Sequence, residues 1–269
     1  MFDDEKRTIQ RMAPLLQRVL IADPQASGAS LIGEAMRNIS RAQTWTASTT
    51  DRALKLCESV DPQLIFVEMS FEKMDGVEFT RKLRRSPFAC RQAPVIMVTG
   101  SATAARILAA RDAGVHEFLR KPFTMKELLR RLEAVTLRQR DWIEAVGYVG
   151  PDRRRFNSGD YTGPLKRRTD NRQTPDAARI GQALKILRSA IADFDKDPAQ
   201  AARAVEAQVV DIQKAATAAA DLTLVTAAAD LHRYVMQSRK MGVSLSRAEV
   251  EKHAARLLAC APRDEPRAA

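Results

Sequence analysis

The sequence predicts a protein of two parts, an α/β domain with a five-stranded parallel sheet and, after it, an all-α helical bundle. The first part is indicated by short apolar runs that alternate five times with helical patterns between residues 18 and 137. This alternation is typical of a parallel sheet with helices on both faces. The second part is indicated by apolar residues that recur at helical spacing after residue 174.

The predicted strands are short apolar or β-branched runs, and four of the five are nearly continuous apolar stretches. Strands that are covered on both faces are expected to look like this. The first run ends at Asp23, and the third ends on a carboxylate, Glu68. The strands are expected at residues 19–22, 44–47, 64–68, 94–99 and 117–120.

The segments between these strands have the spacing of amphipathic helices. In the first of them, Leu31, Ile32 and Met36 share one face. The pair Asp75-Gly76 is suited to start a turn or to cap a helix. The helices are expected at residues 26–37, 53–60, 77–83, 102–113 and 125–137, which gives a charged leader over 1–16 and an α/β domain over 17–140.

Polar residues stand at the carboxyl ends of four of the predicted strands. In open α/β sheets, ligands bind outside these ends. The residues there are Asp23, Glu68, Thr99 and, just past the last strand, Lys121. The sequence therefore predicts that these four side chains converge on one crevice.

Residues 141–174 have no clear periodicity and contain several Gly and Pro residues, so we expect a flexible linker there. This linker holds a repeat, YVGPDRRR from Tyr148 and YTGPLKRR from Tyr161, in which Gly-Pro precedes a basic cluster. After it, Thr174-Pro175 and Asp197-Pro198 are typical helix starts. We expect about four helices over 175–262, with a break near Asp221, a capping box at Ser246 and a tail over 263–269.

The N-terminal domain resembles the receiver domain of bacterial two-component response regulators, a CheY-like domain with a doubly wound, flavodoxin-like fold. The motifs that carry the resemblance are VLIADP, LIFVEMSFEKMDG, PVIMVTG and FLRKPF, in the order and spacing of the family. In that family, two acids after the first strand bind Mg²⁺ together with a phosphoacceptor Asp after the third. A hydroxyl after the fourth strand and a lysine after the fifth contact the phosphoryl group, and an aromatic residue reports the state.

By this resemblance, Asp23 matches the first acid, Thr99 the hydroxyl, Lys121 the lysine and Phe118 the switch aromatic. Two positions depart from the pattern: Pro24 replaces the second acid, and Glu68 replaces the phosphoacceptor Asp. Proline has no side-chain oxygen for a metal, and glutamate is one methylene longer than aspartate. Phosphoryl transfer depends on positioning and on charge neutralisation by metal ions, so we expect a pseudo-receiver that is not phosphorylated and uses no metal or cofactor.

In this interpretation, the longer Glu68 side chain reaches toward Lys121 and Thr99. A Glu–Lys pair is neutral without a metal. Two forms of the hypothesis stay open. In one, Glu68 imitates the phosphorylated state; in the other, it is a structural ion pair in a vestigial site.

The chain is basic, with 44 Lys and Arg against 33 Asp and Glu and a net charge of +11. This excess is compatible with an anionic partner, and also with a basic surface that only keeps the protein soluble. The candidate anion-binding residues are Arg153, Arg154, Arg155, Lys166, Arg167 and Arg168. They suit nucleic acid or a cyclic dinucleotide such as cyclic-di-GMP. The alternatives are a solvated hinge, and arginines docked on acids of either folded part.

Several classes are disfavoured by the sequence. Its 3 cysteines are scattered, no apolar run is long enough to span a membrane, and no signal peptide begins the chain. We therefore expect a cytoplasmic protein. No catalytic output motif follows residue 140, so the three hypotheses are non-enzymatic. They are a regulator that contacts signalling proteins, with the bundle as docking or homodimer element, a nucleotide or nucleic-acid binding effector, and a phosphorelay regulator with an atypical phosphoacceptor.

Overall fold

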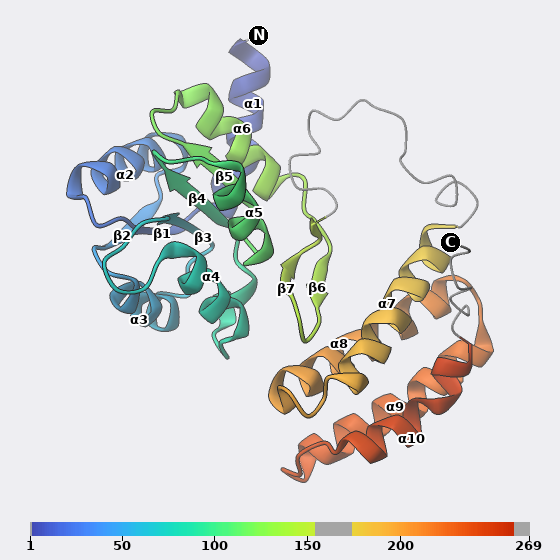
Figure 1. Cartoon of the computed structure of the whole chain (residues 1–269). Helices are drawn as coiled ribbons and strands as arrows, with labels where there is room; N and C mark the ends of the chain where they lie inside the picture. Colours follow the sequence, from blue (N-terminus) through green and yellow to red (C-terminus); the bar gives the residue numbers. More distant parts are fainter. Residues whose placement is uncertain (1, 154–173, 261–269) are drawn as a thin grey trace, which may run out of the picture. The chain divides into compact units, whose positions relative to one another are not determined.

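In a computed structural model that describes residues 2–153 and 174–260, the protein divides into two compact units (Figure 1). The first unit holds the described residues up to Ile143 together with 148–153. The second unit holds Glu144–Gly147 and 174–260. The boundary therefore falls within the segment that the sequence predicts as a linker.

The first unit is built on a parallel sheet of five strands in the order β2-β1-β3-β4-β5 within the described residues. This confirms the predicted α/β architecture. In the register, Ala22 lies beside Val67, and Thr99 lies beside Arg120. The strands are β1 (Arg18–Ala22), β2 (Gln43–Ala47), β3 (Leu64–Glu68), β4 (Val95–Thr99) and β5 (Glu117–Arg120).

Helices cover both faces of this sheet, and each face has its own core. Successive side chains of a strand point to opposite faces: Ile65 packs into the core with α3, α4 and α5, and Phe66 packs into the core with α1, α2 and α6. This two-sided burial explains the continuous apolar runs. The helices are α1 (Phe2–Met12), η1 (Ala13–Leu15), α2 (Ala26–Ser40), α3 (Thr50–Val60), α4 (Gly76–Arg85), η2 (Ala89–Gln92), α5 (Ala104–Asp112) and α6 (Met125–Thr136).

The Asp75-Gly76 pair caps a helix, as predicted. Asp75 Oδ1 accepts a hydrogen bond of 2.7 Å from the backbone N–H of Glu78, which satisfies one of the donors left free at the start of α4. Glycine is required at the next position, because a Cβ on Gly76 would lie 2.2 Å from the carbonyl oxygen of Glu68. The cap and the glycine thus fix the loop that follows Glu68.

A short hairpin stands where the sequence predicts an irregular linker. It consists of β6 (Trp142–Glu144) and β7 (Val149–Pro151). The Tyr148 side chain is buried, and its hydroxyl donates a 2.6 Å hydrogen bond to the Pro151 carbonyl. Three-residue strands are too short to show a period of two, which is why the sequence pattern did not predict them.

The second unit contains the predicted helical bundle. In it, α7 packs on α8, α8 on α9, α9 on α10, and α10 packs on α7. The predicted helix starts are confirmed, because Thr174, Asp197 and Ser246 each accept a backbone N–H in the first turn of a helix. Asp221 caps α9, so the predicted break is also present. The helices are α7 (Pro175–Ala192), α8 (Pro198–Ala218), α9 (Leu222–Lys240) and α10 (Arg247–Ala259).

The bundle core is formed by the apolar stripes of these helices, including Leu184, Val209, Leu231 and Leu257, all of which are buried. Many of the remaining core residues are alanines, so the helices pack closely with few bulky side chains. Within the described residues, no helix is both long enough and apolar enough to cross a membrane.

Candidate functional site

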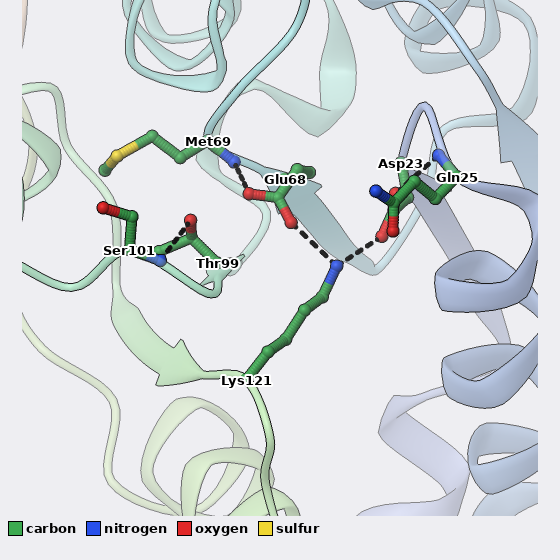
Figure 2. A network of polar contacts seen from close by, with 7 residues as sticks. All are labelled: Asp23, Gln25, Glu68, Met69, Thr99, Ser101 and Lys121. Carbon is green, nitrogen blue, oxygen red and sulfur yellow. Dashed lines mark hydrogen bonds and ion pairs between the residues drawn. The ribbon is translucent and has the colours of Figure 1, made fainter.

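The four predicted polar residues lie at the carboxyl edge of the sheet (Figure 2). Glu68 and Thr99 are the last residues of β3 and β4, and Asp23 and Lys121 directly follow β1 and β5. The hydrogen bonding of the sheet extends to Asp23 and Lys121. Asp23 N donates to Ala47 O at 3.0 Å, and Lys121 N donates to Thr99 O at 2.8 Å. The positions of all four residues are therefore set by the sheet.

Lys121 bridges the two carboxylates of the site. Its ammonium lies 2.8 Å from Asp23 Oδ2 and 2.7 Å from Glu68 Oε2 (Figure 2). The exposed fractions of the side chains are 25% for Lys121, 3% for Asp23 and 12% for Glu68. Burial opposes the charged form of Lys121, but the hydrogen bonds to Asp23 and Glu68 outweigh burial and raise its pKa above the ordinary 10.5.

The remaining carboxylate oxygens are bound by backbone donors. Glu68 Oε1 accepts a 2.8 Å hydrogen bond from Met69 N, and Asp23 Oδ1 accepts one of 2.8 Å from Gln25 N. Each of the four carboxylate oxygens of the site thus has a hydrogen-bond partner supplied by the protein. The predicted contact of Glu68 with Lys121 is present. The expected reach toward Thr99 is not among the described hydrogen bonds, because Met69 N takes the second oxygen instead.

Thr99 and Phe118 are both enclosed by the fold. Thr99 is 2% exposed, and its Oγ1 accepts a 3.3 Å hydrogen bond from Ser101 N. Phe118 is buried in the core between the sheet and helices α3, α4 and α5. Their proposed roles as phosphoryl ligand and switch residue stay predictions.

Two features of the site were not predicted from the sequence. The contact of Asp23 with Lys121 joins residues that are 98 positions apart and that follow β1 and β5, which are not neighbours in the sheet. Gly28, in the first turn of α2, lies so close that a Cβ there would be 2.5 Å from Asp23 Oδ2 and 3.3 Å from Lys121 Nζ. The only sequence signal for Gly28 is its position five residues after Asp23. In the first turn of a helix that begins near Asp23, this position brings the Gly28 backbone close to the Asp23 carboxylate.

The residues present do not fit the Mg²⁺ site that the family resemblance implies. Magnesium needs oxygen ligands in near-octahedral geometry, whereas here an ammonium group lies between the two carboxylates. Pro24 adds no side-chain oxygen and is exposed. In the part of the chain that the structure describes, no group of three or more His, Cys, Asp and Glu side chains could hold a metal.

The basic segment is described only at its beginning. Arg153 Nη1 lies 3.0 Å from Asp112 Oδ1, and its guanidinium lies 4.4 Å from the centre of the Tyr148 ring. This arginine is therefore docked on an acid of the first unit, which is one of the alternatives that the sequence left open. The other candidate anion-binding residues, Arg154, Arg155, Lys166, Arg167 and Arg168, lie outside the described residues, as does Tyr161 of the second repeat.

Comparison with known proteins agrees with the α/β fold of the first unit. Residues 19–133 match the family model of the response regulator receiver domain. The first unit contains a CheY-like receiver domain. Its sequence is 27% identical over 118 residues to the probable chemotaxis protein CheY of Rhizobium etli, and this match spans 91% of that protein and 44% of the present chain. Receiver domains of this kind belong to two-component signalling.

Other relatives extend beyond the region that matches this chain. The transcriptional regulatory protein PdtaR of Mycobacterium tuberculosis is 26% identical over 51% of this chain and 65% of its own length. The cyclic di-GMP phosphodiesterase response regulator RpfG of Xanthomonas campestris is 32% identical over 44% of this chain, but only 32% of its own length. A solved structure of CheY4 from Vibrio cholerae matches 45% of this chain and 98% of its own, with 22% identity and a TM-score of 0.42.

Proposed function

We propose that this protein is a phosphate-independent response regulator, which signals by protein–protein contacts of its receiver domain and helical bundle. The observation that carries the proposal is the double ion pair of Lys121 with Asp23 and Glu68. It occupies the place where the receiver family, by resemblance, holds the metal and the phosphoryl group. The site is thereby filled by the protein's own charges.

The chemistry of phosphoryl transfer supports this proposal. The transfer requires a carboxylate oxygen that is free for in-line attack and a cation that neutralises the incoming charge. Here both oxygens of Glu68 accept hydrogen bonds, from Met69 N and Lys121 Nζ. The ammonium of Lys121 is shared by two carboxylates, so it offers less attraction to an incoming phosphate than a free lysine.

The direct test asks whether the site of the whole 269-residue chain responds to a phosphoryl analogue. We expect that beryllofluoride with Mg²⁺, a phosphoryl analogue, causes no NMR shift changes at Thr99 or Lys121 of the natural chain. The double variant Pro24→Asp/Glu68→Asp restores the family pattern and is expected to respond. An acid-labile phosphate on Glu68 of the natural chain would contradict the proposal and favour the phosphorelay regulator with an atypical acceptor.

Glu68 either imitates the phosphorylated state or forms a structural ion pair in a vestigial site, and neutralising Glu68 distinguishes these two forms of the proposal. If Glu68 imitates the phosphorylated state, Glu68→Gln removes the imitation, and shift changes spread through β4 and β5 to Phe118. If the ion pair is only structural, changes stay within the contacts of Glu68, namely Met69 and Lys121. The matched control is Glu72→Gln, an exposed acid in the loop after β3.

Anion binding by the basic segment remains the alternative. The name of RpfG concerns cyclic di-GMP, but this chain matches only 32% of that protein. Titration of the full chain with cyclic-di-GMP, or with RNA at several salt concentrations, tests the alternative. If binding is seen, replacing both basic clusters of the repeat by alanine should remove it, whereas replacing exposed Arg106 and Arg120 should not. The proposed homodimer through the bundle is tested by sedimentation at several protein concentrations.

A further inference from the structure

Two of the 3 cysteines meet inside the receiver domain, although they are 33 residues apart in sequence. Cys57 lies on α3 and Cys90 in η2, and they are 1% and 3% exposed. Cys90 Sγ donates a 3.2 Å hydrogen bond to the carbonyl oxygen of Cys57, and the two thiols lie close enough for each to shift the pKa of the other. The third, Cys260, is exposed and belongs to the second unit.

A buried guanidinium lies in the same part of the core. Arg84 is 1% exposed and binds the carbonyl oxygens of Gly114, Arg91 and Ala93, at 2.6 to 3.0 Å. Its other hydrogen-bond partner among the described residues is His116 Nδ1 at 3.1 Å, and burial keeps the pKa of His116 well below 6.5, so this ring is neutral. Among the described residues, no carboxylate contacts Arg84. The positive charge of this group thus faces neutral dipoles and the Trp142 ring among the described residues, and any anion that forms nearby is stabilised.

The groups near Arg84 that could become anions are the Tyr148 hydroxyl, whose pKa burial raises to about 12, and the two thiols. The neighbouring thiol of Cys57 lowers the pKa of Cys90, burial and the charge of Asp61 oppose this effect, and the charge of Arg84 adds to the lowering. The pKa of Cys57 is raised by the neighbouring thiol of Cys90 and by burial. The two pKa values shift in opposite directions, so Cys90 is the thiol that ionises when its proton leaves the hydrogen bond to the Cys57 carbonyl. A thiolate with a second thiol beside it is the arrangement that thiol oxidation requires.

We propose that Cys57 and Cys90 form a redox-modification site, at which hydrogen peroxide converts the two thiols into an intramolecular disulfide. In the first step, the Cys90 thiolate attacks one peroxide oxygen, the O–O bond breaks, hydroxide leaves, and Cys90 becomes a sulfenic acid. In the second step, the sulfur of Cys57 attacks Cys90 Sγ, the S–O bond breaks, and a second hydroxide leaves. With the two thiol protons, both hydroxides become water. The sulfurs lose two electrons in total, and the peroxide gains them.

The disulfide would change the receiver domain by closing a loop. The bond needs the sulfurs about 2.05 Å apart, so Cys90 Sγ must turn from the carbonyl oxygen of Cys57 toward its sulfur. The closed loop contains β3, Glu68 and α4. Cross-linking this stretch removes freedom from the unfolded chain and is expected to stabilise the receiver domain. Because both thiols are buried, oxidation waits for a local opening of η2.

The test uses the Cys260→Ser variant of the 269-residue chain, which keeps only the two core cysteines. After hydrogen peroxide treatment, we expect the free thiols of the denatured protein to fall from two to none. Peptide mapping should show a Cys57–Cys90 cross-link that dithiothreitol reverses. Thermal unfolding, followed by the fluorescence of Trp45 and Trp142, should shift upward by roughly 5–10 °C.

Two results would overturn the proposal. One is sulfinic acid on either core cysteine without a cross-link, and the other is full retention of both thiols while Cys260 of the natural chain is oxidised. Cys90→Ser provides the second variant. If it folds, Cys57 should then react with peroxide at least tenfold more slowly than the pair does, and equal rates would contradict the assigned roles. If it does not fold, the mapping of Cys260→Ser decides alone.

Discussion

Lys121 Nζ and Glu68 Oε2 lie 2.7 Å apart, although 53 residues separate them in the chain. Asp23 contacts the same ammonium from the other side at 2.8 Å. Two carboxylates thus share one cation in a site that is largely shielded from water. Removing the cation would leave two like charges that face each other, and such an arrangement destabilises a folded protein more than the loss of an exposed ion pair.

The first prediction concerns Lys121 and alkaline pH. The pKa of Lys121 is raised above 10.5 in the folded protein. Its ion pairs therefore contribute fully to stability below the unfolded pKa of 10.5, and the contribution is lost as the pH rises through the higher folded value. We expect Lys121→Met to lower the unfolding free energy of the receiver domain by about 1–3 kcal/mol at neutral pH. The difference between natural protein and variant should shrink above pH 10.5.

Urea unfolding of the full chain measures this effect. The fluorescence of Trp45 and Trp142 reports on the first unit, because both tryptophans of the sequence lie there. Lys126→Met is the matched control, an exposed cation in the first turn of α6, and should change the stability by less than about 0.5 kcal/mol. A Lys121 variant as stable as this control would show that the triad contributes nothing net.

The positions of the strand ends were predictable from the sequence, but the ion pairs between the side chains at these ends were not. Apolar runs that stop at Asp23 and Glu68 identify the carboxyl edge of the sheet, because parallel strands all end on the same side. The strand order β2-β1-β3-β4-β5 and the side-chain rotamers decide which carboxylate reaches Lys121, and through which oxygen. The spacing of apolar residues in the sequence predicts neither of them. The hairpin from Trp142 to Pro151 was missed for a related reason. All three residues of β7 are buried, Gly150 closely approaches Gly114, and Tyr148 is also buried, so the hairpin shows no alternation of apolar and polar residues.

The second prediction concerns the buried Arg84. Burial lowers the pKa of Arg84 to about 9, so it remains protonated at neutral pH, where it holds three backbone carbonyls and lies 5.3 Å from the Trp142 ring centre. Arg84→Ala leaves these buried acceptors without a donor and opens a cavity. We expect a loss of about 3–5 kcal/mol in the same fluorescence measurement.

Lysine should not rescue this site, because it lacks the planar fork that reaches several carbonyls at once. The control is Arg81→Ala, an exposed arginine on the same helix α4, which should be nearly neutral. If Arg84→Lys were as stable as the natural chain, the fork geometry would not be what matters here.

The third prediction concerns the hairpin at Gly150. This residue has φ +155°, and a Cβ on it would lie 2.7 Å from Gly114 Cα. Gly150→Ala therefore forces two backbones apart, and we expect the receiver domain to lose about 1–3 kcal/mol of stability. Gly147 lies in the turn of the same hairpin, and a Cβ on it would have no atom within 4 Å, so Gly147→Ala is the matched control. Equal stability of the two variants would mean that β7 is not held against the turn at Gly114.

The fourth prediction uses two glycines of α2 to separate helix propensity from the geometry of the site. In a helix, Gly→Ala normally stabilises by up to about 1 kcal/mol. Gly33→Ala should show this gain, because its nearest neighbour is the flexible end of Arg37 at 3.3 Å. Gly28→Ala should show the opposite sign, since its Cβ would lie 2.5 Å from Asp23 Oδ2. Asp23 must then move, which weakens its bond to Lys121. The stability lost as the pH rises through the folded pKa of Lys121 should therefore become smaller in Gly28→Ala but not in Gly33→Ala. If both variants gain stability and lose as much of it at alkaline pH as the natural chain does, the ion pair tolerates displacement, and α2 does not position Asp23.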